Sequence, residues 1–478
     1  MKMFIGGQQT DAADQKVIEI INPATFEVID TVPNANIEDL ECSLNYAQEG
    51  KCEWSNTPLY KRSNILLKYV AKINEHSEEL AEILCKETGK TIQNSLQEIK
   101  SIAGIITSFV ERANHLYGIS MPDNFIGTEN DVVFTRREPL GVVLCVIPFN
   151  YPASTFAYKV APALAVGNAV IIKPPSDNPL TIMRLTELLI EAGVPGNAAQ
   201  VVTGSGSKVG KYLVGSHKID AVSLTGSTDV GIDTAKAAAQ NLHKLHLELG
   251  GNDAIIICED ADIDLAVKEV IASRITNAGQ ICIATKRIII QKTIKEDFTK
   301  KLIDKISNLK VGDPLDPSTD IGCLINEKAA IEVENQVNHT IKQGAKCIYG
   351  GKRFSRTFFE PTILTDITSD MDVAKDMEIF GPVFSIIEFD DIDEAINIHN
   401  STRYGLNGGI MTRDISKAMK TAVKLQCGEV VINGAGYYRN PAIAFGGYKM
   451  SGIGREGASA TLEELTQVKT IIMKRILK

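Results

Sequence analysis

The chain is organised around Thr276-Asn277-Ala278-Gly279-Gln280-Ile281-Cys282, in which a cysteine follows a flexible Gly-Gln turn. A second stretch upstream, Leu247-Glu248-Leu249-Gly250-Gly251, places a glutamate before two glycines. Each has an ordinary explanation alone, because a cysteine is usually a small buried apolar side chain and such a glutamate usually ends a strand. Together they offer a nucleophile and a base, the pair that covalent catalysis requires.

The composition is that of a globular protein with two or three domains: 478 residues, 44% hydrophobic and 23% charged. A net charge of −9 without a Lys/Arg cluster argues against nucleic acid or an acidic membrane as partner. Prolines and polar residues interrupt the longest apolar region, 142–172, which argues against a spanning helix. The cysteines are scattered, so we expect reduced thiols. The histidines lack metal-ligand spacing, so we expect no metal. No secretory leader is visible, so we expect a cytoplasmic location.

Apolar strands alternate with helices through most of the chain. The first strands expected are Val142–Ile147, Ala169–Ile172, Gln200–Val202, Ala221–Leu224 and His243–Leu247, with helices at Ser154–Leu164, Pro179–Ala192, Lys208–Val214 and Asp229–Ala239. A second set has strands at Ala254–Ile257, Ile288–Gln291, Pro382–Phe389, Gly408–Met411 and Val430–Asn433. The alternation predicts an α/β fold with parallel sheets, whose ligands bind beyond the carboxyl ends of the strands.

Two further stretches, Pro148-Phe149-Asn150-Tyr151-Pro152 and Glu378-Ile379-Phe380-Gly381-Pro382, extend the pattern. With the cysteine and glutamate stretches they resemble the aldehyde dehydrogenase superfamily, in the family's order, from about residue 4 to about residue 470. The resemblance is to NAD(P)-dependent, non-acylating members near the succinate-semialdehyde, lactaldehyde and glyceraldehyde-3-phosphate dehydrogenase branches. It implies oxidation of an aldehyde to the free carboxylic acid through a cysteine thiohemiacetal and a thioester.

The resemblance also implies two Rossmann-like α/β domains and a β oligomerisation arm. The cofactor-binding domain would comprise residues 1–118 and 139–249, and the cysteine-bearing catalytic domain residues 250–450. Residues 119–138 and 451–478 would form the arm and the C-terminal tail, whose strand at 468–473 is expected to pair with another subunit in a homodimer or homotetramer. An ordinary surface hairpin remains the alternative for residues 119–138.

The expected phosphate-binding turn is Thr225–Gly231, which leaves one strand and opens a helix. No Gly-x-Gly-x-x-Gly follows a strand, so the ordinary dinucleotide fingerprint is absent. Free N–H groups in a first helical turn favour anions, although a plain helix cap by Ser227 or Thr228 would explain the same residues. The resemblance makes this turn face the phosphates, with Gly226, Ser227 and Gly231 as its contacts.

Other residues resemble those that hold the rest of NAD or NADP. Lys173 resembles the lysine at the adenosine ribose, Glu378 the glutamate at the nicotinamide ribose, and Phe380 the ring near the nicotinamide. Ser176 occupies a position where many members carry a ribose-binding glutamate, so the repulsion of a 2′-phosphate is missing and NADP should be tolerated or preferred. The remaining cofactor candidates are Phe149, Pro175, Gly204 and Leu249.

Three residues carry the expected chemistry. Cys282 is the nucleophile, and the amide of Asn150 with the backbone N–H of Cys282 would stabilise the oxyanion. Glu248 would activate the water that hydrolyses the thioester. Asn150 lies between two prolines, whose fixed φ angles restrict its backbone.

The substrate tail is expected to contact Tyr158, Ile281, Ile283, Tyr437, Tyr438 and Arg439. Succinic semialdehyde enzymes often carry an arginine where Tyr158 stands, and glyceraldehyde-3-phosphate enzymes often carry one where Ile281 stands. Arg439 is either an anion clamp or a solvated loop residue. The expected substrate is therefore a small aldehyde of the semialdehyde or lactaldehyde type, either anionic or neutral.

Two alternatives to this function remain. A CoA-acylating relative would resolve the thioester with CoA instead of water, which the presence of Glu248 disfavours. The second alternative is a structural or binding protein on the same fold, which would lack one of the catalytic groups. The presence of Cys282, Glu248 and Asn150 disfavours it.

Overall fold

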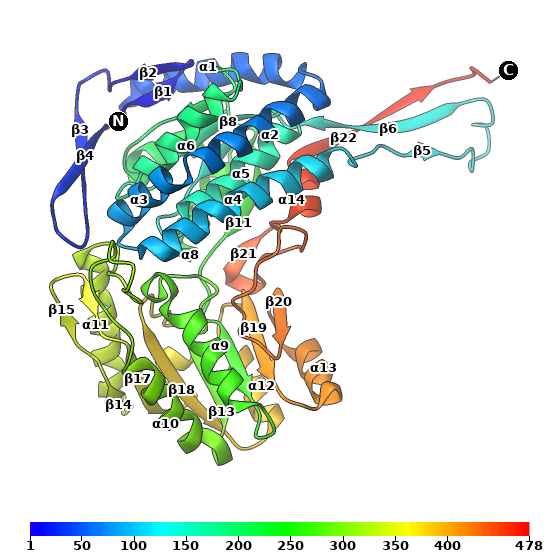
Figure 1. The fold of residues 1–478 in the computed structure, drawn as a ribbon. Helices are drawn as coiled ribbons and strands as arrows, with labels where there is room; N and C mark the ends of the chain where they lie inside the picture. The colour runs from blue at the N-terminus through cyan, green and yellow to red at the C-terminus, as the bar shows by residue number, and fades with distance from the viewer. Residues whose placement is uncertain (478) are drawn as a thin grey trace.

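The computed structural model, which describes residues 1–477, is built from two α/β lobes and a β arm that projects from one of them (Figure 1). The first sheet has the strand order β2-β1-β9-β8-β7-β10-β11-β21. Its strands are β1 (Met3–Ile5), β2 (Gln8–Thr10), β7 (Val142–Val146), β8 (Ala169–Lys173), β9 (Ala199–Val201), β10 (Ala221–Thr225), β11 (Lys244–Glu248) and β21 (Gly452–Ile453). The five central strands are parallel, and β1 and β21 join them antiparallel.

Both faces of this sheet are buried, which explains why its strands are almost continuously apolar. Val143 and Cys145 of β7 face one core, whereas Val142 and Leu144 face another. The first core is covered by α2 (Leu59–Glu75), α3 (Ser77–Thr88), α4 (Ile92–Ala113), α5 (Pro152–Ala165) and α6 (Leu180–Glu191). The second is covered by α1 (Ile37–Ser55), α7 (Lys211–Val214) and α8 (Thr228–Ala239).

The second sheet repeats this plan, with the strand order β14-β17-β18-β13-β12-β19-β20. Its strands are β12 (Ala254–Ile257), β13 (Arg287–Gln291), β14 (Lys346–Tyr349), β17 (Thr362–Ile367), β18 (Val383–Phe389), β19 (Asn407–Met411) and β20 (Glu429–Ile432). Helices α9 (Ile263–Ile275) and α10 (Lys295–Ile306) cover one face, and α11 (Glu327–Lys342), α12 (Ile392–Asn400) and α13 (Ile415–Lys424) cover the other. Two small hairpins, β3–β4 (Val17–Ile21, Val28–Pro33) and β15–β16 (Arg353–Phe354, Phe358–Phe359), lie outside both sheets. The α/β class and the two-sheet architecture agree with the sequence analysis.

The arm is a three-stranded sheet of β5 (Ser120–Met121), β6 (Val132–Pro139) and β22 (Thr466–Met473), and β22 runs out toward its tip (Figure 1). Within the chain, β22 pairs antiparallel with β6 over its whole length, and the expected pairing of this strand with another subunit stays a prediction. Within residues 1–477, the other edge of β22 has no strand beside it.

The boundary of the tail also differs from the expectation. Gly452 and Ile453 form β21 beside β11, and α14 (Ala458–Glu464) packs Leu462 into the first core. Residues 452–464 therefore belong with the first sheet, since an apolar side chain such as Leu462 needs a core that the arm does not have. The expected helix at 208–214 is a π-helical turn, Gly206–Gly210, followed by α7. Residues 1–477 contain no helix that is long and apolar enough to span a bilayer.

Candidate active site

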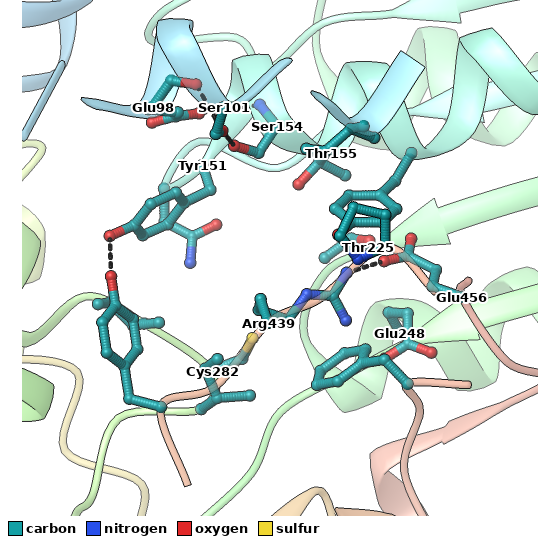
Figure 2. Close-up of a pocket in the computed structure, with 18 of the residues that line it drawn as sticks. Glu98, Ser101, Tyr151, Ser154, Thr155, Thr225, Glu248, Cys282, Arg439 and Glu456 are labelled. Carbon is teal, nitrogen blue, oxygen red and sulfur yellow. Dashed lines mark hydrogen bonds and ion pairs between the residues drawn. The ribbon is translucent and has the colours of Figure 1, made fainter. Parts of the chain in front are cut away.

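A cavity of about 470 Å³ lies where the two lobes meet (Figure 2). Glu248 enters it from the end of β11, Thr225 from the end of β10, and Asn150 from the loop before α5. Most of the expected catalytic and substrate-binding residues line it: Asn150, Tyr158, Glu248, Ile281, Cys282, Ile283, Tyr437 and Arg439. Tyr438 is an exception, because its side chain is 51% exposed and lies outside the lining. The cavity is at the carboxyl ends of parallel strands, where such folds bind ligands.

The segment before Cys282 is a left-handed turn. Asn277, Ala278 and Gly279 have φ angles of 51°, 51° and 77°. At Gly279 an added Cβ would lie 2.3 Å from the carbonyl oxygen of Gly381, so only glycine fits. This turn redirects the chain at the end of α9 and brings Cys282 to the cavity wall.

Side-chain amides connect this turn to the loop of Asn150. The amide of Asn150 donates to the carbonyl oxygen of Gln280 at 3.0 Å, and the amide of Asn277 donates to the backbone oxygen of Asn150 at 3.0 Å. The Gln280 amide donates to the Asn277 backbone oxygen at 3.1 Å and its Oε1 accepts from Ile325 N–H. Asn277 and Gln280 were not among the residues predicted to form the site, although both stand in the cysteine stretch itself. Their bonds fix Asn150 relative to Cys282 and leave one Asn150 N–H free for a ligand.

The Cys282 thiol and the Glu248 carboxyl both have raised pKa values. Burial raises the pKa of the Cys282 thiol to about 12. Burial, followed by the negative charge of Glu456, raises the pKa of Glu248 well above its ordinary value. Neither carboxyl oxygen of Glu248 has a hydrogen-bond partner within the described chain, and its nearest basic neighbour, His246 Nε2, is 3.7 Å from Oε1. An unpartnered buried carboxyl group calls for a hydrogen-bond partner, such as a water or a substrate group.

Glu456, which the sequence analysis missed, joins two cations at the same cavity. Its Oε1 is 3.1 Å from Lys159 Nζ, and its Oε2 is 3.0 Å from Arg439 Nη2. Although burial opposes ionisation, Lys159 and Arg439 together lower the pKa of Glu456 to about 2. Glu456 comes from the segment after β21, so its proximity to α5 could be found only from the folded chain.

Arg439 lies in the cavity wall and is not a solvated loop residue. Its guanidinium carbon is 3.7 Å from the ring centre of Phe445 and 4.4 Å from that of Tyr158. Figure 2 shows the guanidinium directed toward Glu456, with Cys282 and Glu248 nearby. Nη1 is buried without a hydrogen-bond partner among residues 1–477. The stacked rings fix the guanidinium plane and leave one of its donor groups unsatisfied.

The residues expected at the adenosine end of the cofactor lie together at the end of β8. Lys173 is buried at the end of β8, its Nζ is 3.4 Å from Ser176 Oγ, and burial lowers its pKa to about 8. Ser176 in turn donates to the carbonyl oxygen of Gly204 at 3.1 Å. Pro175 is buried beside them. A cation at the end of a parallel strand is suited to the sugar or phosphate of an adenosine group.

The expected phosphate-binding turn lies at the start of α8. Ser227 caps the helix by accepting from the N–H of Val230, which leaves other first-turn N–H groups directed outward. A Cβ on Gly231 would lie 2.5 Å from Leu249, so Gly231 allows α8 to pack closely on Leu249. Both the helix cap and the anion site are therefore compatible with these residues.

At the other end, Phe149 and Phe380 meet edge to face with their centres 6.0 Å apart. Glu378 Oε1 accepts from the Gly251 N–H at 3.4 Å, and a Cβ on Gly250 would lie 2.6 Å from Glu378 Oε2. A carboxylate beside two aromatic rings and close to Cys282 suits the hydroxyl groups of a ribose next to a flat heterocycle.

Comparison with known proteins agrees with this arrangement. Residues 10–471 match the model of the Aldehyde dehydrogenase family. The lactaldehyde dehydrogenase of Methanococcus aeolicus is 36% identical over 98% of this chain and 99% of its own, and the 3-sulfolactaldehyde dehydrogenase of Priestia aryabhattai is 36% identical over 98% and 97%. The betaine aldehyde dehydrogenase of Staphylococcus aureus in complex with NAD+ superposes with a TM-score of 0.96 at 34% identity, over 99% of this chain and 95% of its own. This coverage shows that the chain belongs to the aldehyde dehydrogenase family and is an NAD(P)-dependent aldehyde dehydrogenase.

Proposed function

We propose that this enzyme oxidises a small aldehyde with an anionic or hydroxyl group through covalent catalysis by Cys282. The observation that carries the proposal is the meeting of Cys282, Asn150 and Glu248 in one cavity. The thiolate of Cys282 attacks the aldehyde carbon, and the free Asn150 N–H with the Cys282 backbone N–H stabilises the oxyanion. A bound nicotinamide would supply the acceptor for the hydride that leaves the Cys282 adduct. Glu248 then takes a proton from the water that cleaves the thioester, which releases the acid and the Cys282 thiol.

Water is the proposed acceptor of the acyl group. Both oxygens of Glu248 are buried and unpartnered in residues 1–477, and they face a cavity large enough for a water beside a small substrate. The alternative acceptor is CoA. Stimulation of NAD(P)H formation by CoA, with acyl-CoA as the product, would contradict the hydrolytic route.

Arg439 supports the proposed substrate class. It presents an unsatisfied donor beside Cys282 and Glu248, and an anion or hydroxyl next to the aldehyde would satisfy it. The names of the two relatives, lactaldehyde and 3-sulfolactaldehyde dehydrogenase, describe short hydroxylated aldehydes, one of them with an anionic group.

We propose that NADP is used at least as well as NAD. Ser176 carries no charge to repel a 2′-phosphate, and Lys173 lies within 3.4 Å of its hydroxyl. Ser176→Glu should shift the kcat/KM ratio toward NAD by about one to two powers of ten, because it introduces a like charge. A wild type that strongly prefers NAD, with an unchanged ratio in the variant, would exclude this role.

We also propose a homodimer or homotetramer in the cytoplasm. The support for assembly is the exposed apolar side chains of the arm, such as Val468 and Ile472. The support for a reducing compartment is the absence of disulfides among the nine cysteines, all of which lie in the described chain.

The first experiment is a panel of short aldehydes assayed with NAD and with NADP. Unsubstituted, hydroxylated and anionic aldehydes of equal carbon number should differ in KM. The unsubstituted aldehydes should have the highest KM. Cys282→Ala serves as the control, since it should remove oxidation while the protein stays folded and binds cofactor. Oxidation at the parent rate in this variant would remove Cys282 from the mechanism.

A further inference from the structure

Lys286 is a buried lysine next to the catalytic loop, and the sequence analysis assigned no role to it. It stands just before β13, and its side chain is 2% exposed. Its ammonium donates to the carbonyl oxygen of Cys282 at 2.5 Å and to that of Ala284 at 3.4 Å. The same Nζ lies 3.1 Å from Oε1 of Glu378. One charged group therefore touches the backbone of Cys282 and the carboxylate proposed to hold the nicotinamide ribose.

The contacts extend to the aromatic groups beside the proposed nicotinamide position. The Lys286 ammonium is 5.9 Å from the ring centre of Phe380, which packs against Phe149. Glu378 is only partly exposed, with 18% of its side chain accessible. Lys286 thus lies between the cysteine loop and the segment 378–380, which are far apart in the sequence.

A full charge at this position needs an explanation. A buried ammonium is costly unless its three N–H groups are bonded and an anion is near. Two carbonyl oxygens and one carboxylate meet that need here, but a neutral donor could hold the same two carbonyls without the desolvation cost. What a neutral donor cannot supply is a positive electrostatic potential at the neighbouring thiol.

We propose that Lys286 is a positioning residue that holds the Cys282 backbone and favours the Cys282 thiolate, and that Glu378 weakens this effect by pairing with the Lys286 ammonium. The inference rests on the proposed function, in which the Cys282 thiolate is the nucleophile.

The surroundings of the thiol agree with this assignment. The charged or titratable groups that face Cys282 are Lys286, Asp253, Glu248, Glu378, Tyr151 and Arg439. After burial, which raises the pKa of the thiol, Lys286 has the largest effect and lowers that pKa, whereas Asp253, Glu248 and Glu378 raise it. Removal of the cation should therefore leave three carboxyl groups acting against ionisation.

The test measures thiolate formation directly, without turnover. Full-length protein is treated with iodoacetamide between pH 7 and pH 10 without aldehyde, and alkylation of the Cys282 peptide is followed by mass spectrometry. Lys286→Met should slow alkylation about tenfold at each pH below the thiol pKa, which is a rise of about one pKa unit. Lys286→Arg should retain most of the parent rate, and Glu378→Gln should alkylate several-fold faster.

Lys295→Met is the matched control, because Lys295 is also paired with two carboxylates, Asp366 and Glu388, but lies outside the cavity lining. Its alkylation rate should equal that of the parent. Equal rates in folded Lys286→Met and the parent would overturn the proposal. If Lys286→Met does not fold, the proposal would be overturned by a Glu378→Gln variant whose Cys282 is alkylated no faster than that of the parent. Since alkylation requires no catalysis, a failure of the proposed function would appear separately, as turnover in Cys282→Ala.

Discussion

At the scale of single residues, substitution of Glu248 should separate formation of the acyl-enzyme from its hydrolysis. Glu248→Gln keeps the shape of the side chain and loses the base, so the acyl-enzyme should form and then hydrolyse slowly. Stopped-flow absorbance should record a burst of NAD(P)H close to one equivalent per site, followed by a slow steady state. Loss of the burst with intact cofactor binding would instead assign Glu248 to activation of the Cys282 thiol.

Arg439 tests the substrate class. Arg439→Met removes the unsatisfied donor and should raise KM for an anionic aldehyde by about 10- to 100-fold, as expected for a charged hydrogen bond worth about 1.5–3 kcal/mol. The KM of a neutral aldehyde of the same length serves as the internal control and should change far less. Equal increases for both substrates would mean that Arg439 acts only through its packing on Tyr158 and Phe445.

The pH dependence follows from two raised pKa values. In the proposed mechanism, the Cys282 thiol, whose pKa is raised to about 12, and the Glu248 carboxyl, whose pKa lies well above its ordinary value, must both lose a proton. Activity should therefore rise from pH 6 to pH 9. Glu248 should lower stability as the pH rises from the ordinary carboxyl pKa to its raised pKa in the folded state, because over that interval the folded state holds the proton more tightly than the unfolded state. A pH–rate profile of kcat/KM with a maximum near pH 6 would contradict the expected sign.

At the scale of an element, the left-handed turn from Asn277 to Gly279 determines where Cys282 stands. Arg274 supports it from the end of α9, where its buried guanidinium donates to the carbonyl oxygens of Gly279, Ile379 and Val383. The turn is thereby tied both to α9 and to the segment that carries Glu378. A small movement of the turn would shift the nucleophile relative to Asn150, with a large effect on rate.

Gly279→Ala should lower stability by about 3 kcal/mol or more and abolish most activity. The φ of 77° disfavours any side chain, and the new Cβ would meet the backbone of Gly381 at 2.3 Å. Gly210→Ala is the control, because a Cβ there meets no atom within 4 Å. Thermal unfolding and kcat should distinguish the two variants, and equal melting temperatures would show that the turn tolerates the change.

At the scale of the whole molecule, the arm is the feature most open to a second subunit. Val468 and Ile472 of β22 are 56% and 57% exposed, and they point to one side of the strand. The double variant Val468→Asp, Ile472→Asp should give monomers in sedimentation velocity if the arm mediates assembly, since buried unpaired charges are strongly unfavourable. Val423→Asp on α13 is the control, because this valine is 82% exposed and should not alter the mass. A double variant with the parent's mass would exclude the β22 surface.

The order of strands and helices was predictable from the sequence, because strands buried on both faces are continuously apolar and helices show their own period. The local stretches around Asn150, Glu248, Cys282 and Glu378 were also recognisable, since each consists of residues adjacent in the chain. Only the tertiary structure decided the pairing of β22 with β6, the place of β21 and α14 beside the first sheet, and the contacts of Glu456, Lys286 and Arg439. These contacts join segments from different parts of the chain, and a side chain's charge becomes informative only when its neighbours and its burial are known.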